Sequence, residues 1–132
     1  MGSIFTKIIN REIPAYIVAE DDKFIAFLDI MPLAEGHTLV IPKKEIDDFF
    51  DIEDTMLSDM VVFAKHVAQA IKKSIYCRKI GVAVVGLEVP HAHIHLIPLQ
   101  SVEDINFSKS KLKVPAERLR SIANDVQTHF IA

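Results

Sequence analysis

The sequence predicts an α+β domain that contains a five-stranded antiparallel sheet, one long helix and an additional C-terminal helix. Three observations support this fold class. Five short runs of β-branched and aromatic residues are separated by turn residues, one long stretch repeats apolar residues at spacings of three and four, and a second such stretch closes the chain. The length of 132 residues suits one domain, and 50% of the residues are hydrophobic, which is enough for one sizeable core.

The first predicted elements are a short helix and a β-hairpin. Ser3 precedes four apolar residues within residues 4–9, so it is the expected N-cap of a helix that ends before Pro14. Two runs rich in β-branched and aromatic residues follow at 16–19 and 24–28. The Glu-Asp-Asp tripeptide between them supplies turn residues, and we therefore expect the two strands to pair as a hairpin.

A third strand and the long helix are predicted next. Residues 29–36 contain a proline and a glycine and indicate a loop. Residues 37–41 then have the composition of a strand, which Pro42 ends. Apolar residues recur at helical spacing through 54–75, so we expect an amphipathic helix there with Asp54 as its N-cap, covering one face of the sheet.

The last third of the chain predicts two more strands and the C-terminal helix. The strands are expected at 80–85 and 89–97, joined through Gly86 by a connection short enough for antiparallel neighbours. Residues 101–113 are polar and show no clear pattern. Pro115 is expected at the first position of the final helix. The apolar stripe of that helix consists of Leu119, Ile122, Ala123, Val126 and Phe130.

Composition argues against two classes of partner. Lys and Arg number 15 and Asp and Glu number 18, and the net charge of −3 offers no basic surface for nucleic acid. No apolar run approaches the ~20 residues that a bilayer span needs. Cys77 is the single cysteine, so no internal disulfide is possible, as is usual in a reducing compartment. We expect no nucleic-acid partner, no membrane association and a cytoplasmic location.

A row of histidines is the main chemical feature of the sequence. His91, His93 and His95 alternate with apolar residues, and alternate side chains of a strand share a face, about 6.5–7 Å apart along the strand. The alternating residues Ala92, Ile94 and Leu96 are expected to enter the core. Three imidazoles side by side are a poor choice for packing, because each buried ring needs hydrogen-bond partners. The row therefore indicates function.

Two chemistries suit such a row. A His-x-His pair on a strand can place two nitrogens on one zinc ion, with a third ligand from elsewhere. Alternatively, one neutral imidazole attacks an electrophile while its neighbours donate hydrogen bonds to the developing charge. An ordinary histidine pKa near 6.5 suits both roles. The row by itself leaves both alternatives open.

The sequence resembles the histidine triad (HIT) family, in its Hint branch of histidine triad nucleotide-binding proteins. Residues 91–97 match the family signature His-φ-His-φ-His-φ-φ, where φ is apolar. Further blocks that resemble the family in order are 4–9, 12–15, 27–30 and 36–44. The resemblance implies a HIT-like fold in a single domain over 1–132, with a core at about 3–98. The extension at about 99–132 resembles no block of the family.

The resemblance also implies a hydrolase that cleaves purine nucleoside phosphoramidates or related nucleoside monophosphate derivatives. His93 matches the nucleophile, which would form a nucleotidyl-histidine intermediate that water hydrolyses. His95 would donate to a phosphate or leaving-group oxygen, and His91 and His37 would complete the polar cluster. Asp29 matches the acid that accepts the ribose hydroxyls. The resemblance implies no cofactor and no catalytic metal.

The substrate slot and the assembly are implied in the same way. Relatives pair as homodimers through the long helix and an adjoining strand. The apolar slot for the base would consist of Ile4, Phe5, Ile8, Phe27, Leu28 and Ile30. The backbone amides of Glu88 and Val89 would bind phosphate oxygens. The Glu88 carboxylate repels a phosphate unless it turns away or the leaving group is amine-like.

Two departures from the family pattern bear on the chemistry. Residues 82–90 contain no asparagine or glutamine, whereas relatives that hydrolyse dinucleoside polyphosphates use a glutamine beside the phosphates. Some bacterial relatives bind a structural zinc, and this chain has Ser3, Thr6 and Glu45 at those ligand positions, so no such zinc is expected. The alternatives to a phosphoramidase are a dinucleoside polyphosphate hydrolase, a slow or non-catalytic nucleotide-binding interaction module, and a metal-dependent hydrolase that uses the triad as ligands.

Overall fold

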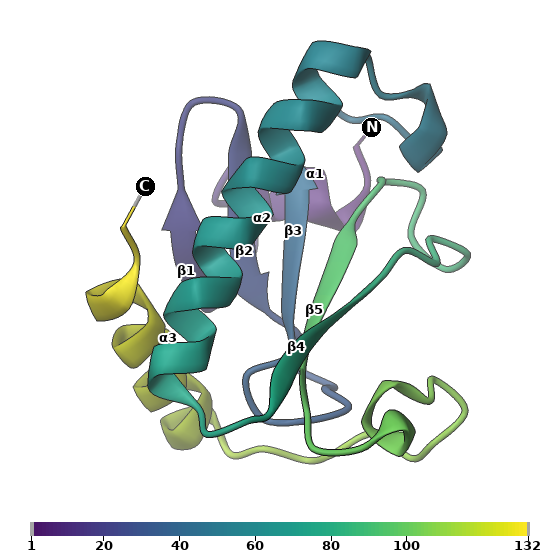
Figure 1. Ribbon diagram of the computed structural model, residues 1–132. Helices are drawn as coiled ribbons and strands as arrows, with labels where there is room; N and C mark the ends of the chain where they lie inside the picture. The colour runs from purple at the N-terminus through teal and green to yellow at the C-terminus, as the bar shows by residue number, and fades with distance from the viewer. Residues whose placement is uncertain (1, 132) are drawn as a thin grey trace.

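The central element of the structure is a five-stranded sheet in which every neighbouring pair is antiparallel (Figure 1). The computed structural model describes residues 2–131. The strands are β1 (Ile17–Glu20), β2 (Phe24–Leu28), β3 (Thr38–Pro42), β4 (Lys79–Ala83) and β5 (Ile94–Leu99). Their order across the sheet is β1-β2-β3-β5-β4, so β1 and β4 form the edges. The predicted five-stranded antiparallel sheet is confirmed.

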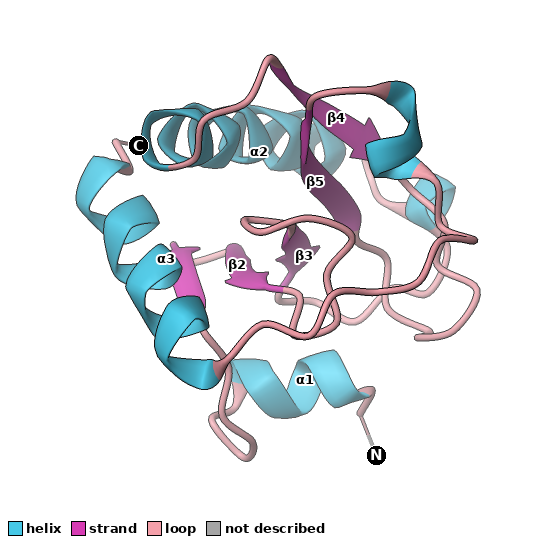
Figure 2. Ribbon diagram, turned by 90° about the horizontal axis from the view of Figure 1, so that it is seen from below, coloured by secondary structure: helices cyan, strands magenta, loops and turns pink. Residues whose placement is uncertain are grey.

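Helices cover both faces of this sheet. The long helix α2 (Asp54–Ser74) crosses one face, and the short helix α1 (Ile4–Ile9) lies on the opposite side (Figure 2). The third helix, α3 (Ala116–His129), lies beside α2 and β1. Two short 3₁₀ turns, η1 (Phe49–Asp51) and η2 (Val102–Ile105), precede α2 and follow β5. The α+β class with a long helix and a C-terminal helix is confirmed.

The two covered faces explain why β2 is buried along its whole length. Alternate side chains of a strand point to opposite faces. Phe24, Ala26 and Leu28 join the apolar core beneath α2 and α3. Ile25 and Phe27 join a second apolar cluster beneath α1. A strand covered on both sides therefore has a continuous apolar sequence instead of an alternating one.

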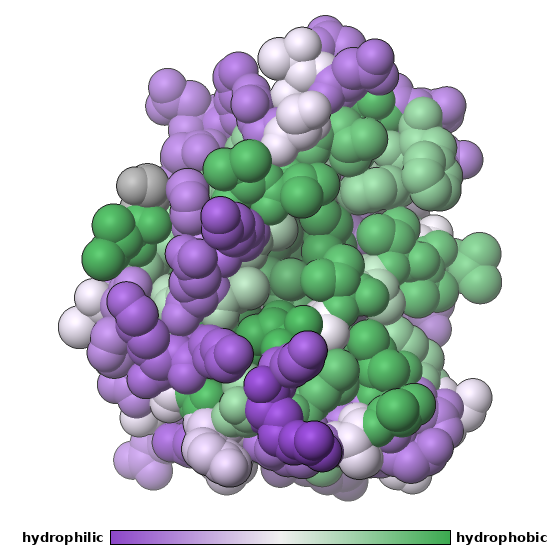
Figure 3. Space-filling view, viewed as in Figure 1, coloured by the Kyte–Doolittle hydropathy of each residue, from purple (hydrophilic) through white to green (hydrophobic). Residues whose placement is uncertain are grey.

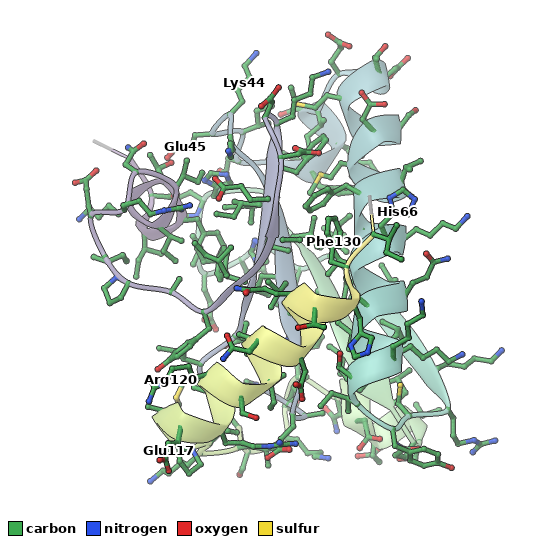
Figure 4. The ribbon with its side chains drawn as sticks, turned by 90° about the vertical axis from the view of Figure 1, so that its left-hand side faces the viewer. Lys44, Glu45, His66, Glu117, Arg120 and Phe130 are labelled. Carbon is green, nitrogen blue, oxygen red and sulfur yellow. The ribbon has the colours of Figure 1, made fainter. Side chains whose placement is uncertain are left out.

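The C-terminal helix is part of the main core. Ile122 and Val126 on α3 are 1% and 0% exposed and pack in the cluster beneath α2. Phe130 follows the last turn of α3, and Figure 4 shows it against α2. Its ring centroid is 5.8 Å from that of Phe63 on α2. The predicted apolar stripe is therefore the surface with which α3 docks.

Several predicted boundaries were wrong. The strand expected to start at Val89 begins at Ile94, because Pro90 lacks an N–H and residues 84–93 form a loop. In that loop the His91 N–H bonds to the Val89 carbonyl and the Ala92 N–H bonds to the Ile46 carbonyl, so neither group joins the sheet ladder. β1 and β3 each start one residue later than expected.

The predicted helix caps also shift by one residue. Asp54 lies inside α2, after Glu53 as N-cap, and Pro115 is the N-cap of α3 instead of its first residue. Ser3 is the N-cap of α1 as predicted, and its hydroxyl oxygen accepts from the Thr6 N–H. Within residues 2–131 no helix is both long enough and apolar enough to cross a membrane.

The docking of α3 predicts a large effect of truncating one of its buried side chains. We expect Ile122→Ala to lower the free energy of unfolding by about 2–5 kcal/mol, because the substitution leaves a cavity in a covered core. The measurement is urea unfolding followed by circular dichroism. The matched control is Asn124→Ala on the exposed side of the same helix, which should change stability by less than about 0.5 kcal/mol. Equal effects would mean that α3 does not contribute to the core.

Candidate active site

Four histidines gather on the face of the sheet that α1 covers. His37 directly precedes β3, His91 and His93 lie in the loop before β5, and His95 lies in β5. All four are buried. The ring centroids of His93 and His95 are 4.8 Å apart, closer than the spacing of alternate residues along a strand, because the rings tilt toward each other. The alternating residues Ala92, Ile94 and Leu96 enter the core beneath α2, as predicted.

His91 is held at both ring nitrogens. Its Nε2 lies 2.8 Å from the carbonyl oxygen of Pro42, which can only accept, so Nε2 carries the proton. Its Nδ1 lies 2.9 Å from the Ser3 hydroxyl, which donates to it. Burial lowers the pKa of His91, which favours this neutral ring. His91 therefore links the start of α1 to the end of β3 and has no nitrogen free for a metal.

His93 is held at one of its two ring nitrogens. Its Nδ1 donates to the carbonyl oxygen of His91 at 2.7 Å, so the neutral ring carries its lone pair on Nε2. Nε2 has no hydrogen-bond partner within residues 2–131. Phe5 of α1 packs edge-on against the ring, with 5.1 Å between centroids. The structure thus fixes the orientation of the ring and leaves Nε2 without a partner in the described part of the chain.

A backbone amide sets the protonation of His37 and His95. The Leu33 N–H donates to Nδ1 of His37 at 3.0 Å, so a neutral His37 carries its proton on Nε2. That proton points to Nδ1 of His95, 2.9 Å away. His95 must then carry its own proton on Nε2. The hydrogen-bond chain makes Nε2–H of His95 a donor whose direction is fixed by the fold.

Both members of this pair are neutral at physiological pH. Burial, followed by the nearby His95 and Lys111, lowers the pKa of His37 to about 3. Burial, followed by His93 and Lys111, lowers the pKa of His95 to about 4. A charged imidazole is disfavoured away from water. His95 is therefore a neutral hydrogen-bond donor, and the two rings add no positive charge to the site.

Asp29 follows β2 and faces the histidine cluster. Its Oδ1 accepts the Met31 N–H at 2.9 Å, and its Oδ2 lies 3.8 Å from Nε2 of His37. Burial raises the pKa of Asp29. Asp29, His37 and His95 offer ligand atoms that lie within 4.8 Å of one another. A cation there would have to displace the hydrogen bond between the two histidines, and the sequence had not indicated this group of three as a metal site.

The residues predicted for the apolar slot are brought together only in part. Phe5, Ile8 and Phe27 pack in one cluster, and the centroids of the two phenylalanine rings are 5.4 Å apart. Ile4 and Ile30 are 53% and 60% exposed and lie outside this cluster. The cluster has three further members that were not among the predicted residues, although alternation along β2 and β3 indicates them. These are Ile25, Leu39 and Ile41.

The position predicted for Leu28 requires a correction. Leu28 lies in the core beneath α2, on the opposite face of the sheet from Phe27, because adjacent strand residues point to opposite faces. Val89 packs partly buried against the cluster of Phe5 and Phe27. Glu88 is exposed, and its charge is close enough to raise the pKa of Asp29. Glu88 therefore adds negative charge near Asp29.

A cavity of about 260 Å³ lies beside His93. It opens between η1 and the loop that follows β4, which contribute Phe49, Phe50 and Leu87 as apolar walls. Asp47 and Asp48 also line it. The cavity therefore combines an apolar interior with negative charge.

The three positions where some relatives hold zinc do lie together. Oε1 of Glu45 accepts both the Ser3 N–H and the Thr6 hydroxyl, each at 2.6 Å. Figure 4 shows Glu45 beside α1. The hydrogen bond from Thr6, followed by that from Ser3, lowers the pKa of Glu45. A carboxylate therefore ties α1 to the segment after β3, and through Ser3 this network reaches His91.

Sequence reasoning missed two residues of the site, both in the polar stretch 101–113. The ring of Phe107 packs edge-on against His95, with 4.9 Å between centroids. Lys111 lies over the ring of Phe107, 5.8 Å from its centroid. No periodic pattern marks this stretch, because its residues contact the site through an irregular turn. Only the lone aromatic residue in a polar segment was a signal.

The fold and the site define a small α+β protein whose sheet carries an ordered cluster of buried histidines next to an apolar cluster. The chain belongs to the HIT domain family, which matches residues 10–102. The resemblance inferred from the sequence is thus confirmed. The matched residues include the whole triad and end within η2, so Phe107 and Lys111 lie beyond them.

Relatives agree with this assignment. An uncharacterized HIT-like protein of Borreliella burgdorferi is 37% identical over 136 residues, which cover 96% of this chain and 97% of that protein. The adenosine 5'-monophosphoramidase HNT1 of Saccharomyces cerevisiae is 44% identical over 96 residues, covering 72% of this chain and 61% of that protein. A solved Hit-like protein from Bartonella henselae, described as involved in cell-cycle regulation, superposes on this chain with a TM-score of 0.84 and is 34% identical in sequence. The superposition covers 97% of this chain and 96% of the Bartonella chain.

The lowered pKa values predict that the protein loses stability in mild acid. The unfolded histidines titrate near 6.5, whereas His37 and His95 in the folded protein titrate at about 3 and about 4. Between these values the unfolded chain binds more protons, so the free energy of unfolding falls as the pH falls from about 6.5 toward 4, by about 1.4 kcal/mol per pH unit for each such histidine. Asp29 acts in the opposite direction at the acid end, because its pKa is raised.

Urea unfolding at pH 7.5, 6.5, 5.5 and 4.5 measures this slope. His37→Gln should reduce the dependence of the free energy of unfolding on pH by an amount equivalent to about one bound proton, and His66→Gln on α2 serves as the matched histidine substitution outside the cluster. A wild-type stability that stays flat from pH 6.5 to 4.5 would contradict the neutral, buried pair.

Proposed function

We propose that this protein hydrolyses purine nucleoside phosphoramidates, or related nucleoside monophosphate derivatives, through a covalent nucleotidyl-histidine intermediate. The observation that carries the proposal is the unpartnered Nε2 of His93 beside a neighbour, His95, whose tautomer is set as a donor. The relative named adenosine 5'-monophosphoramidase supports the substrate class. The hydrogen bond from Nδ1 of His93 to the His91 carbonyl supports nucleophilic chemistry, because it leaves Nε2 as the nitrogen that can attack.

The reaction divides into two displacements at phosphorus. Nε2 of His93 attacks, a bond forms between that nitrogen and phosphorus, and the bond from phosphorus to the leaving nitrogen breaks, while the leaving nitrogen takes up a proton from solvent and departs as an amine. Water then attacks the phosphorus, the bond from phosphorus to Nε2 breaks, one proton of the water returns to solvent, and the nucleoside monophosphate and the neutral imidazole are released. Throughout, the Nδ1–H of His93 stays on the His91 carbonyl, which stabilises the ring as it becomes cationic.

The surroundings of the four histidines suggest how the parts of the substrate bind. The purine base would lie beside the buried apolar cluster of Phe5, Ile8 and Phe27, and Asp29 would accept hydrogen bonds from the ribose hydroxyls. The cavity beside His93 gives room for the leaving group. Its carboxylates Asp47 and Asp48 favour an amine over a polyphosphate leaving group, since like charges repel. This charge supports a phosphoramidase over a dinucleoside polyphosphate hydrolase.

Replacing the nucleophile tests the proposal. We expect His93→Ala to lower the single-turnover rate of amine release from an adenosine phosphoramidate by three orders of magnitude or more, because no other group takes over the attack. A fluorescent amine reports the release. His66→Ala, a histidine substitution on α2 (Figure 4), should leave the rate unchanged.

Chelator and binding measurements separate the alternatives. Release that a chelator abolishes and zinc restores would assign a metal-dependent hydrolase. Nucleotide binding without release in the wild type would assign a binding module. Circular dichroism confirms that each variant is folded.

The surface over α2 and β4 supports a homodimer as the assembly. β4 is an edge strand, and no strand within residues 2–131 pairs with its outer side. Its outer backbone groups can therefore pair with a strand of another copy. Val61 and Val62 on α2 are each 52% exposed, and Val82 on β4 is 64% exposed. Figure 3 shows apolar side chains gathered over this face. A contiguous apolar surface of this kind is typical of an interface, and a second copy of the chain matches both the helix and the strand edge.

A charge placed on this surface should separate the protomers. We expect Val61→Glu combined with Val82→Glu to sediment as a monomer at micromolar concentration, whereas the wild type sediments as a dimer, because the interface would have to bury two unpaired carboxylates in each copy. The control Val102→Glu changes an 83% exposed valine outside α2 and β4 and should leave the dimer intact. A wild type that sediments as a monomer would overturn the proposed assembly.

A further inference from the structure

The segment from Asn106 to Leu112 lies against the histidine cluster. The ring of Phe107 packs 4.9 Å from His95 and 6.4 Å from His37, centroid to centroid. The Leu112 N–H donates to the Pro32 carbonyl at 2.8 Å, which ties the segment to the loop before β3. This segment belongs to the extension and lies outside the residues that the family matches.

A tight turn directs the side chains of this segment. The side-chain oxygen of Asn106 accepts the Ser108 N–H at 2.9 Å, and the backbone carbonyl of Asn106 accepts the Lys109 N–H at 3.1 Å. The turn places Phe107 against the histidines. Lys109 instead approaches Asp104, with 3.8 Å between the charged atoms. Two lysines two residues apart therefore have different surroundings.

Lys111 lies close to the site and retains hydrogen-bonding capacity. Its Nζ donates to the Phe107 carbonyl at 2.9 Å and lies 5.8 Å from the centroid of that ring. An ammonium group has three donors, so two remain for a ligand. The carbonyl and the aromatic ring hold the ammonium group without neutralising it.

The charge balance of the site shows why this cation matters. Within residues 2–131, Lys111 is the one lysine or arginine whose charge acts on the pKa values of Asp29, His37 and His95 together. The two histidines are neutral, and Asp29 and Glu88 add negative charge. A phosphate that enters such surroundings loses water and needs a positive partner.

We propose that Lys111 binds the phosphate of the substrate, with Phe107 as the residue that positions it. The inference rests on the proposed function and adds to it a contact from the extension. The ammonium group donates to a non-bridging phosphate oxygen, and it stabilises the negative charge on those oxygens while His93 attacks. Recognition by Lys111 requires only an anionic phosphate, whereas the base and ribose depend on other residues.

The test is equilibrium binding of two ligands that differ by one phosphate. Adenosine 5'-monophosphate and adenosine are titrated by calorimetry into the wild type, Lys111→Met, Lys111→Arg and the matched control Lys109→Met. We expect Lys111→Met to weaken binding of the monophosphate by about tenfold or more and binding of adenosine by less than twofold, as the loss of a charge-assisted hydrogen bond predicts. Lys111→Arg should restore most of the affinity, and Lys109→Met should match the wild type.

The outcomes separate this inference from the proposed function. If the wild type binds both ligands and Lys111→Met keeps the full preference for the monophosphate, the Lys111 contact is wrong and the proposed function stands. If Lys111→Met weakens both ligands equally, Lys111 has a structural role and the inference is again wrong. If the wild type binds neither ligand, both proposals fail together.

Discussion

Four buried imidazoles dominate the structure, and the need to satisfy each ring nitrogen constrains the rest of it. A buried imidazole whose nitrogens lack hydrogen-bond partners lowers the stability of the folded protein. Here the Leu33 amide, the Pro42 carbonyl, the Ser3 hydroxyl and the His91 carbonyl supply them. The partners also determine which nitrogen of each neutral ring carries the proton. The same hydrogen bonds that make burial tolerable leave one lone pair, on His93, and one directed donor, on His95.

The fold brings these partners from distant parts of the chain. Ser3 lies at the start of α1, Leu33 in the loop before β3, and Pro42 at the end of β3. The triad lies in the loop before β5 and at the start of that strand, with only His95 inside β5. β3 is paired directly with β5, which places His37 beside His95. α1 packs against the face of the sheet that carries the histidines, and Glu45 anchors its first turn. The main core therefore lies beneath α2 and α3 on one face of the sheet, and the other face carries α1, the second apolar cluster and the four histidines.

Sequence patterns predicted those features that depend on local periodicity. Alternation placed Ala92, Ile94 and Leu96 in the core and their histidine neighbours on the other face, and the three-four spacing located α2 and α3. The same reasoning failed where structure is irregular. β5 starts after a proline-containing loop that composition alone did not distinguish from a strand, and Leu28 was grouped with Phe27 although neighbouring strand residues point apart. Phe107 and Lys111 were missed because an irregular turn, with no repeat, carries them to the site.

The sequence by itself determined the fold class, the element order and the family, and it singled out the candidate histidines, since these depend on spacing within short segments. Only the tertiary structure decided which nitrogen of each histidine is protonated, that His37 and His95 are neutral, and that an extension lysine adds its charge to the site. These properties depend on burial and on partners far apart in sequence, such as Ser3 with His91 and Leu33 with the pair of His37 and His95. Hydrogen bonds and desolvation act through space, and no local pattern encodes them.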